Sequence, residues 1–170
     1  YTSSDRWRFV QFGDFMIAAN GEDKLQYADM ATTTISFADL DASTPTAKFV
    51  TVVRDFVVAG STNTSSSQMV WSGINNPNTW SNTAVTQSDT QTIPDGGEIK
   101  GITGGEFGLI LLDRSVVRMS YVGSPIIFQF DNIARNLGCF ESNSVVQWQG
   151  ITYWLADDGF YACNGESIEA

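Results

Sequence analysis

The sequence contains no histidine, the side chain most often used near neutral pH as a general base or a metal ligand. Its absence excludes a Ser–His or Cys–His nucleophile pair within the chain. Cysteine is also scarce, since only Cys139 and Cys163 occur. They could form one disulfide, but two cysteines make neither a disulfide framework nor a zinc site without histidine. We expect two reduced, partly buried thiols, no bound cofactor and no metal.

Basic residues are few, with nine Lys and Arg against nineteen Asp and Glu and a net charge of −10. This balance argues against binding nucleic acid by neutralising its phosphates. The acidity either keeps the protein soluble or provides a surface that repels a polyanion, as a channel for sliding DNA requires. No apolar run reaches eighteen residues, so we expect no membrane span, and the polar start does not read as a signal peptide.

Four stretches of the chain begin in nearly the same way. Each has a short apolar pair, a polar break near Gly or Asp, and a second apolar run that ends in a turn residue. The stretches start at Phe9, Phe49, Ile99 and Val145, which are 40, 50 and 46 residues apart. A period in this range is typical of propellers, solenoids and arrays.

Strands are the natural interpretation of these repeats. The apolar runs at 15–17, 56–58, 109–112 and 153–155 are short and bounded by Gly, Asp and Asn. A second candidate strand follows each, at 24–27, 68–71, 116–121 and 159–162, after turn residues suited to hairpins. Three repeats add an aromatic segment, at 35–37, 78–80 and 127–130. Three to four strands in about 45 residues match one propeller blade.

The predicted fold is therefore all-β, a β-propeller or partial propeller of about four antiparallel blades of 40–50 residues. We place a single domain or segment over 1–170, with blades near 7–40, 47–80, 98–133 and 144–170. No window has the spacing of a good helix, and the best candidate, 131–137, is one or two turns. Because the sequence starts without Met and stops inside the fourth repeat, we expect it to be part of a longer polypeptide.

Equivalent positions of the four apolar runs predict the core. We expect burial of Phe15, Ile17, Phe56, Val58, Leu109, Leu111, Tyr153 and Leu155.

Two polar segments interrupt the repeats. Residues 61–68 form a predicted exposed hairpin loop, and residues 81–97 a predicted linker of about seventeen residues that ends in a Pro-Asp-Gly-Gly turn. Long loops on a rigid scaffold are where contacts to other subunits tend to lie, although simple solvent exposure is an equal alternative. The candidate subunit-contact residues are Ser61, Asn63, Ser66, Asn82, Gln87 and Asp89.

Catalytic motifs are not found. Glycines 101, 104 and 105 lack the spacing and the Lys of a phosphate-binding loop. Paired carboxylates could support glycoside hydrolysis, but most Asp residues stand at predicted turns, where Asp is expected for backbone reasons. The Asp157-Asp158-Gly159 run is better explained as a hairpin turn than as a calcium site. No catalytic residue is assigned, and we expect no enzyme activity.

Several segments together carry a family resemblance. They are MVWSGINNPNTW at 69–80, IPDGG with Ile99 and Gly101-Ile102, RMSYVGSP at 118–125 with Phe128, and DDGFY at 157–161 followed by Asn164-Gly165. The sequence resembles the propeller-containing tail nozzle or head–tail DNA-stabilisation proteins of short-tailed bacteriophages, over roughly 69–168 and more weakly over 1–60. Such proteins are usually much longer, so the chain would be their propeller portion.

The resemblance implies a structural virion protein at the tail or head–tail junction, made in the host cytoplasm. Its partners would be other virion proteins and copies of itself in a ring below the portal, with genomic DNA passing through without tight binding. An alternative is a carbohydrate-binding or adhesin propeller, in which the five Trp residues stack on sugar rings, although packing between blades explains most of them. A propeller hydrolase is disfavoured because the repeated Asp-box of sialidases is absent.

Overall fold

The computed structural model describes residues 1–2 and 6–170, which form four antiparallel sheets of four strands each. The first sheet contains β1 (Arg8–Phe12), β2 (Phe15–Ala19), β3 (Gln26–Asp29) and β4 (Ala38–Asp39). The second contains β5 (Ala47–Val53), β6 (Phe56–Thr62), β7 (Gln68–Trp71) and β8 (Asp89–Thr92). The third contains β9 (Ile99–Thr103), β10 (Gly108–Leu112), β11 (Ser115–Gly123) and β12 (Ile127–Arg135). The fourth contains β13 (Val146–Trp148), β14 (Ile151–Ala156), β15 (Gly159–Cys163) and β16 (Ile168–Glu169).

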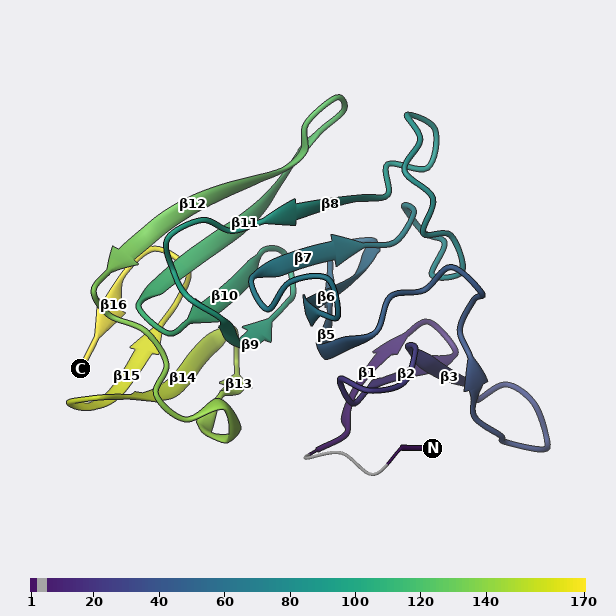
Figure 1. Ribbon diagram of the computed structural model, residues 1–170, viewed down its shortest axis with the longest axis horizontal. Coiled ribbons are helices and arrows are strands. Elements are labelled where there is room, and N and C mark those ends of the chain that lie inside the picture. The colour runs from purple at the N-terminus through teal and green to yellow at the C-terminus, as the bar shows by residue number, and fades with distance from the viewer. Residues whose placement is uncertain (3–5) are drawn as a thin grey trace.

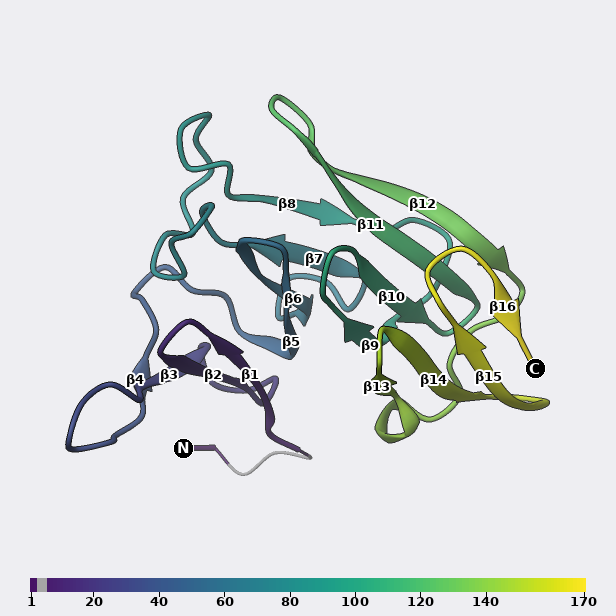
Figure 2. The ribbon, with the colours of Figure 1, turned by 180° about the vertical axis from the view of Figure 1, so that it is seen from behind.

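Every sheet is a meander in which strands that follow one another in the chain lie side by side. The sheets fan around a common centre, with the first and fourth at the two ends of the fan (Figures 1 and 2). The first strands of the sheets, β1, β5, β9 and β13, lie innermost. The arrangement is that of a partial β-propeller, and it confirms the predicted fold class.

The core consists of three apolar layers between successive sheets. Strand β6 supplies two of them, because neighbouring side chains on a strand point to opposite faces. Val57 and Ala59 pack towards the first sheet, whereas Phe56 and Val58 pack towards the third. The side chains of strand β10 are likewise shared between two layers. Ile110 and Leu112 lie in the layer between the second and third sheets, and Leu109 and Leu111 in the layer between the third and fourth. The central strands read as continuous apolar runs because both of their faces are covered.

Five of the eight predicted core residues are buried: Ile17, Phe56, Val58, Leu109 and Leu111. The prediction is wrong for Phe15, Tyr153 and Leu155, which are half-buried. In β14 the buried side chains are instead Thr152, Trp154 and Ala156. Tyr153 and Leu155 lie on the opposite face of that strand, where no sheet covers them.

The outer strands differ most from expectation. Segment 35–37 precedes the two-residue strand β4, and 78–80 is not a strand. The fourth strand of the second sheet is β8, which lies within the predicted linker 81–97 and pairs with β7 in the register Gln68↔Thr92. The helical candidate 131–137 is strand up to Arg135, because β12 pairs with β11 as far as Ser115↔Arg135. The described residues contain a single short 3₁₀ turn, η1 (Ser142–Ser144), and no α-helix.

No helix in the described part of the chain is long and apolar enough to cross a membrane.

Candidate functional site

The innermost strands surround the axis of the fan, where two cavities share several lining residues. One, of about 370 Å³, is lined by residues of β1, β5 and β9 and by the start of β13. The other, of about 810 Å³, is lined by residues of β1, β5 and β9 and by neighbouring loops, among them the loop that contains Asn20–Glu22 and the segment at Glu141–Asn143. All four sheets thus contribute to a single axial region, which is the first candidate functional site.

Four basic and three acidic side chains gather at this axis. They are Arg6, Arg8, Lys48 and Lys100 with Glu22, Glu98 and Glu141. The chain's excess of acidic residues is therefore not concentrated here, contrary to the expectation of an acidic channel. Net charge is a sum over the whole surface, so it does not say where the charges lie.

Arg8, Lys100 and Glu98 have side-chain partners at this axis. The Arg8 guanidinium donates to Ser142 Oγ at 3.2 Å and lies 4.4 Å from the centroid of the Phe49 ring. Lys100 donates a short hydrogen bond to Glu98 and lies 3.3 Å from Asp113. The hydrogen bond to Glu98, with a further contribution from Asp113, raises the pKa of Lys100 above its ordinary value. Lys100 is therefore a paired cation at neutral pH.

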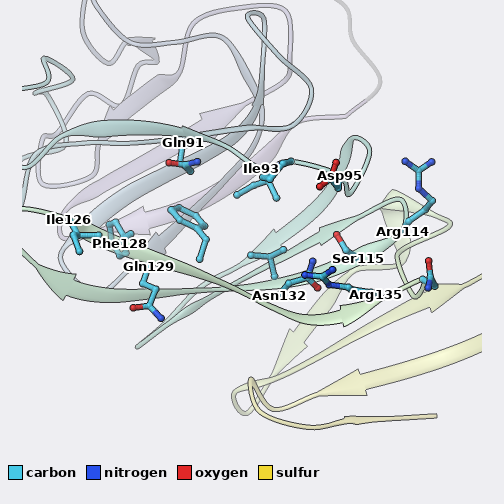
Figure 3. A pocket seen from close by; sticks show the side chains of 14 residues that line it. Gln91, Ile93, Asp95, Arg114, Ser115, Ile126, Phe128, Gln129, Asn132 and Arg135 are labelled. Atoms are coloured by element: carbon cyan, nitrogen blue, oxygen red, sulfur yellow. The ribbon is translucent and has the colours of Figure 1, made fainter.

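A second candidate site is the outer-rim groove, a cavity of about 720 Å³ between β8 and β12. Figure 3 shows Gln91 and Ile93 on one side of it, facing Phe128, Gln129 and Asn132. Arg114 and Arg135 lie at one end of the groove. Ser115 also lines it, and its buried hydroxyl has no hydrogen-bond partner within the protein. Amides, guanidinium groups and aromatic rings thus share one concave surface.

The first predicted contact loop is less free than expected. Ser61 is buried within β6, so it is not available to another subunit, whereas Asn63 and Ser66 are exposed. The carbonyl of Ser66 accepts the backbone N–H of Ile99 at 2.9 Å. The loop therefore joins the second and third sheets.

The second predicted contact loop also holds the structure together. Asn82 is exposed and donates to Asp89 at 2.6 Å. The backbone carbonyl of Gln87 accepts the Trp71 indole N–H at 2.8 Å, and its side-chain oxygen accepts the Tyr121 hydroxyl at 3.0 Å. Gln87 thus links the second sheet to the third, a role that its polar surroundings in the sequence did not reveal.

Replacing Tyr121 by Phe tests this link. The substitution removes one partly buried hydrogen bond, so we expect the free energy of unfolding to fall by about 0.5–1.5 kcal/mol in urea titrations. Tyr161→Phe is the matched control, because the Tyr161 hydroxyl makes its hydrogen bond to Asp158 in an exposed position. Equal losses for the two variants would contradict the assignment of Gln87 as a link.

The two cysteines are free and buried, as expected from their number. Burial raises the pKa of both thiols, Cys139 and Cys163. Cys139 Sγ also donates to the backbone carbonyl of Glu141 at 3.3 Å. Among residues 1–2 and 6–170, no three His, Cys, Asp or Glu side chains are grouped so as to hold a metal ion.

Because the thiolate is the reactive form, both cysteines should resist thiol reagents in the native protein. With Ellman's reagent near pH 8 we expect slow labelling, and rapid release of two equivalents once the chain is unfolded in guanidinium. A Ser66→Cys variant, which places a thiol at an exposed position, should add one rapidly reacting equivalent. Immediate labelling of the unmodified chain would contradict the burial of the thiols.

No protein-family model and no curated protein matches the chain. A solved structure, dihydro-heme d1 dehydrogenase NirN in complex with DHE, is similar to it with a TM-score of 0.60 and 11% sequence identity. The alignment covers 98% of this chain and 36% of that one, so the chain spans about a third of the length of NirN. At this identity the likeness concerns the fold alone. NirN is a β-propeller protein, and the chain described here has the fold of part of a propeller.

Proposed function

We propose that this chain is a structural, non-enzymatic component of a tailed-phage virion, in the tail nozzle or the head–tail hub around the DNA channel. The resemblance of residues 69–80, 93–102, 118–128 and 157–165 to such proteins supports it. The structural observation behind it is that the outward faces of the first and fourth sheets carry large exposed apolar side chains, among them Phe9, Trp148 and Phe160. Apolar faces of this kind mark surfaces that other protein subunits cover.

The composition of purified virions tests this proposal. Mass spectrometry of virions from the source phage should detect the chain at a stoichiometry of several copies per particle. Gold-labelled antibody fragments against it should mark the tail or the head–tail junction in electron micrographs. Absence of the chain from purified particles, with presence only in the lysate, would overturn the proposal.

The pairing of charges at the axis bears on how DNA would pass. Lys100 is paired with Glu98 and Asp113. The other basic side chains of the axial region share their cavity with Glu22 and Glu141, so the region is not a strongly basic surface for phosphates. We therefore expect no shift of duplex DNA in gels at physiological salt. As a matched control, Glu22→Lys combined with Glu141→Lys makes the same region strongly basic and should produce salt-sensitive binding. Tight binding by the unmodified chain would contradict passage without retention.

Carbohydrate binding is a second candidate, favoured by the outer-rim groove rather than by tryptophans. Trp71 and Trp154 are buried and cannot stack on a sugar. The groove instead offers the amides of Gln91 and Asn132 beside the ring of Phe130. On a glycan array, retention that disappears with Asn132→Ala but persists with Trp148→Ala would support this function. No retention of the unmodified chain would exclude it for the glycans tested.

A further inference from the structure

One face of the fourth sheet is largely apolar and uncovered, with Glu169 of β16 as the acidic residue at its outer edge. Residues paired directly across antiparallel strands share a face, and here the pairs are Val146↔Tyr153 and Leu155↔Phe160. Trp148 lies two residues beyond Val146 and joins the same face. Val146, Trp148 and Phe160 are 56%, 63% and 73% exposed. We call this surface, formed by Val146, Trp148, Tyr153, Leu155 and Phe160, the leading face.

The leading face corresponds to surfaces that are covered elsewhere in the chain. Tyr153 and Leu155 lie on the second strand of their sheet, on the face that corresponds to the one occupied by three other pairs: Phe15 and Ile17, Phe56 and Val58, and Leu109 and Leu111. Each of those pairs packs against the sheet that follows it. The fourth sheet is therefore built to receive another sheet in the same manner.

The first sheet has the complementary open surface. Phe9 pairs with Ala18, whose neighbour Ile17 points the other way, towards the second sheet. Trp7 stacks on Phe9 at 6.5 Å between ring centroids, and Phe37 meets Phe9 edge-on at 6.2 Å. Together with Tyr1 they surround a shallow cavity of about 170 Å³. We call this surface, formed by Tyr1, Trp7, Phe9 and Phe37 above the buried Ala18 and Gln26, the trailing face.

We propose that the leading face of one copy of this chain packs on the trailing face of a second copy. The contact repeats an interface that already occurs three times within the chain, where the face corresponding to the leading one meets the face corresponding to the trailing one. The aromatic cavity of the trailing face provides a socket for an exposed ring of the leading face, such as Trp148 or Phe160.

Two such contacts between two copies of the chain form a closed ring. Two copies of four sheets give a ring of eight, within the four to eight blades typical of propellers. The two end sheets open on the same side of the fan, so a half-turn brings each leading face to a trailing face (Figure 2). A head-to-tail interface that closes after a half-turn gives a two-fold dimer rather than a filament.

Charge predicts how this dimer responds to salt. Each copy carries a net charge of −10, so the two repel one another over their whole surfaces. The faces themselves are mainly apolar and aromatic, with Glu169 at the edge of one and Gln26 within the other. Salt screens the repulsion and leaves the burial of apolar surface intact, so dimerisation should strengthen as the salt concentration rises. An interface held by ion pairs would weaken instead.

Sedimentation equilibrium of the purified chain, over a wide range of concentration, measures the association. We expect a mass twice the 18.6 kDa of one copy, with tighter association at high salt. Trp148→Glu and Phe160→Glu should each give monomers, with β-sheet circular dichroism unchanged because both side chains are exposed. Val85→Glu is the matched control, since Val85 is 88% exposed on a loop away from both faces and should leave the dimer intact.

Cross-linking tests which faces meet. A Phe9→Cys copy mixed with a Phe160→Cys copy should form a disulfide-linked pair on mild oxidation, whereas neither variant alone should cross-link to itself. A monomer at all concentrations overturns the proposal, as do self-linked Phe160→Cys pairs, and open-ended polymers overturn the closed ring. These measurements use the purified chain, so their outcome is independent of whether the chain is present in virions.

Discussion

Replacing Leu111 by alanine should lower the free energy of unfolding by about 2–5 kcal/mol, measured by urea denaturation. Leu111 is fully buried between the third and fourth sheets, in the layer that contains Leu109 and Trp154. The substitution leaves a cavity whose walls belong to paired strands of two sheets. Such walls relax little, so the lost contacts are not replaced.

Leu155→Ala is the matched control, because Leu155 has the same position in the fourth sheet but no sheet lies against it. At a protein concentration low enough to keep the chain monomeric, we expect a loss well below that of Leu111→Ala. Similar losses for the two variants would mean that the leading face is covered within a single copy.

Placing a methyl group at position 104 should destabilise the protein by about 3 kcal/mol or more, at the upper end of the range for overpacking. A Cβ on Gly104 would lie 2.0 Å from the backbone oxygen of Val52 and 2.5 Å from Thr51 Oγ1. The carbonyl of Val52 cannot turn aside, because it accepts the N–H of Gly105 at 2.9 Å. The second and third sheets would have to separate at this point.

Gly13→Asn is the control for Gly104→Ala. A Cβ at Gly13 meets no atom within 4 Å, and its φ of +56° is a conformation that asparagine tolerates. We expect a small change in the urea midpoint for Gly13→Asn and a large one for Gly104→Ala. Equal stability of the two variants would show that the sheets are not in the close contact described here.

The central strands were predictable because their signal is local. Runs such as 109–112 are apolar at every position, and their shortness and flanking turn residues favour a buried strand over a helix. The outer strand β8 was missed for the opposite reason. Three of its four residues, Thr90, Gln91 and Thr92, are exposed, so the strand has no apolar alternation and resembles a polar linker. It forms a strand only because its backbone pairs with the otherwise open edge of β7.

The candidate sites were less predictable than the fold. The polar composition of 61–68 and 81–97 indicated free loops, yet Ser61 is buried and Gln87 bonds to two sheets. The identity of a polar residue does not indicate whether its side chain bonds to water or to a tyrosine far away in the sequence. Likewise, Arg8 and Lys100 are far apart in the sequence, and only the convergence of the innermost strands brings them to one cavity.

By itself the sequence determined the all-β class, the four-fold repetition and the residues of the central strands. These follow from side-chain periodicity and turn chemistry, which act between neighbours in the chain. Only the tertiary structure decided which apolar faces are covered, where the basic side chains meet, and which polar residues join the sheets. Burial and charge at a point depend on what lies opposite it, so Leu111 and Leu155, equivalent in the sequence, have different surroundings and different roles.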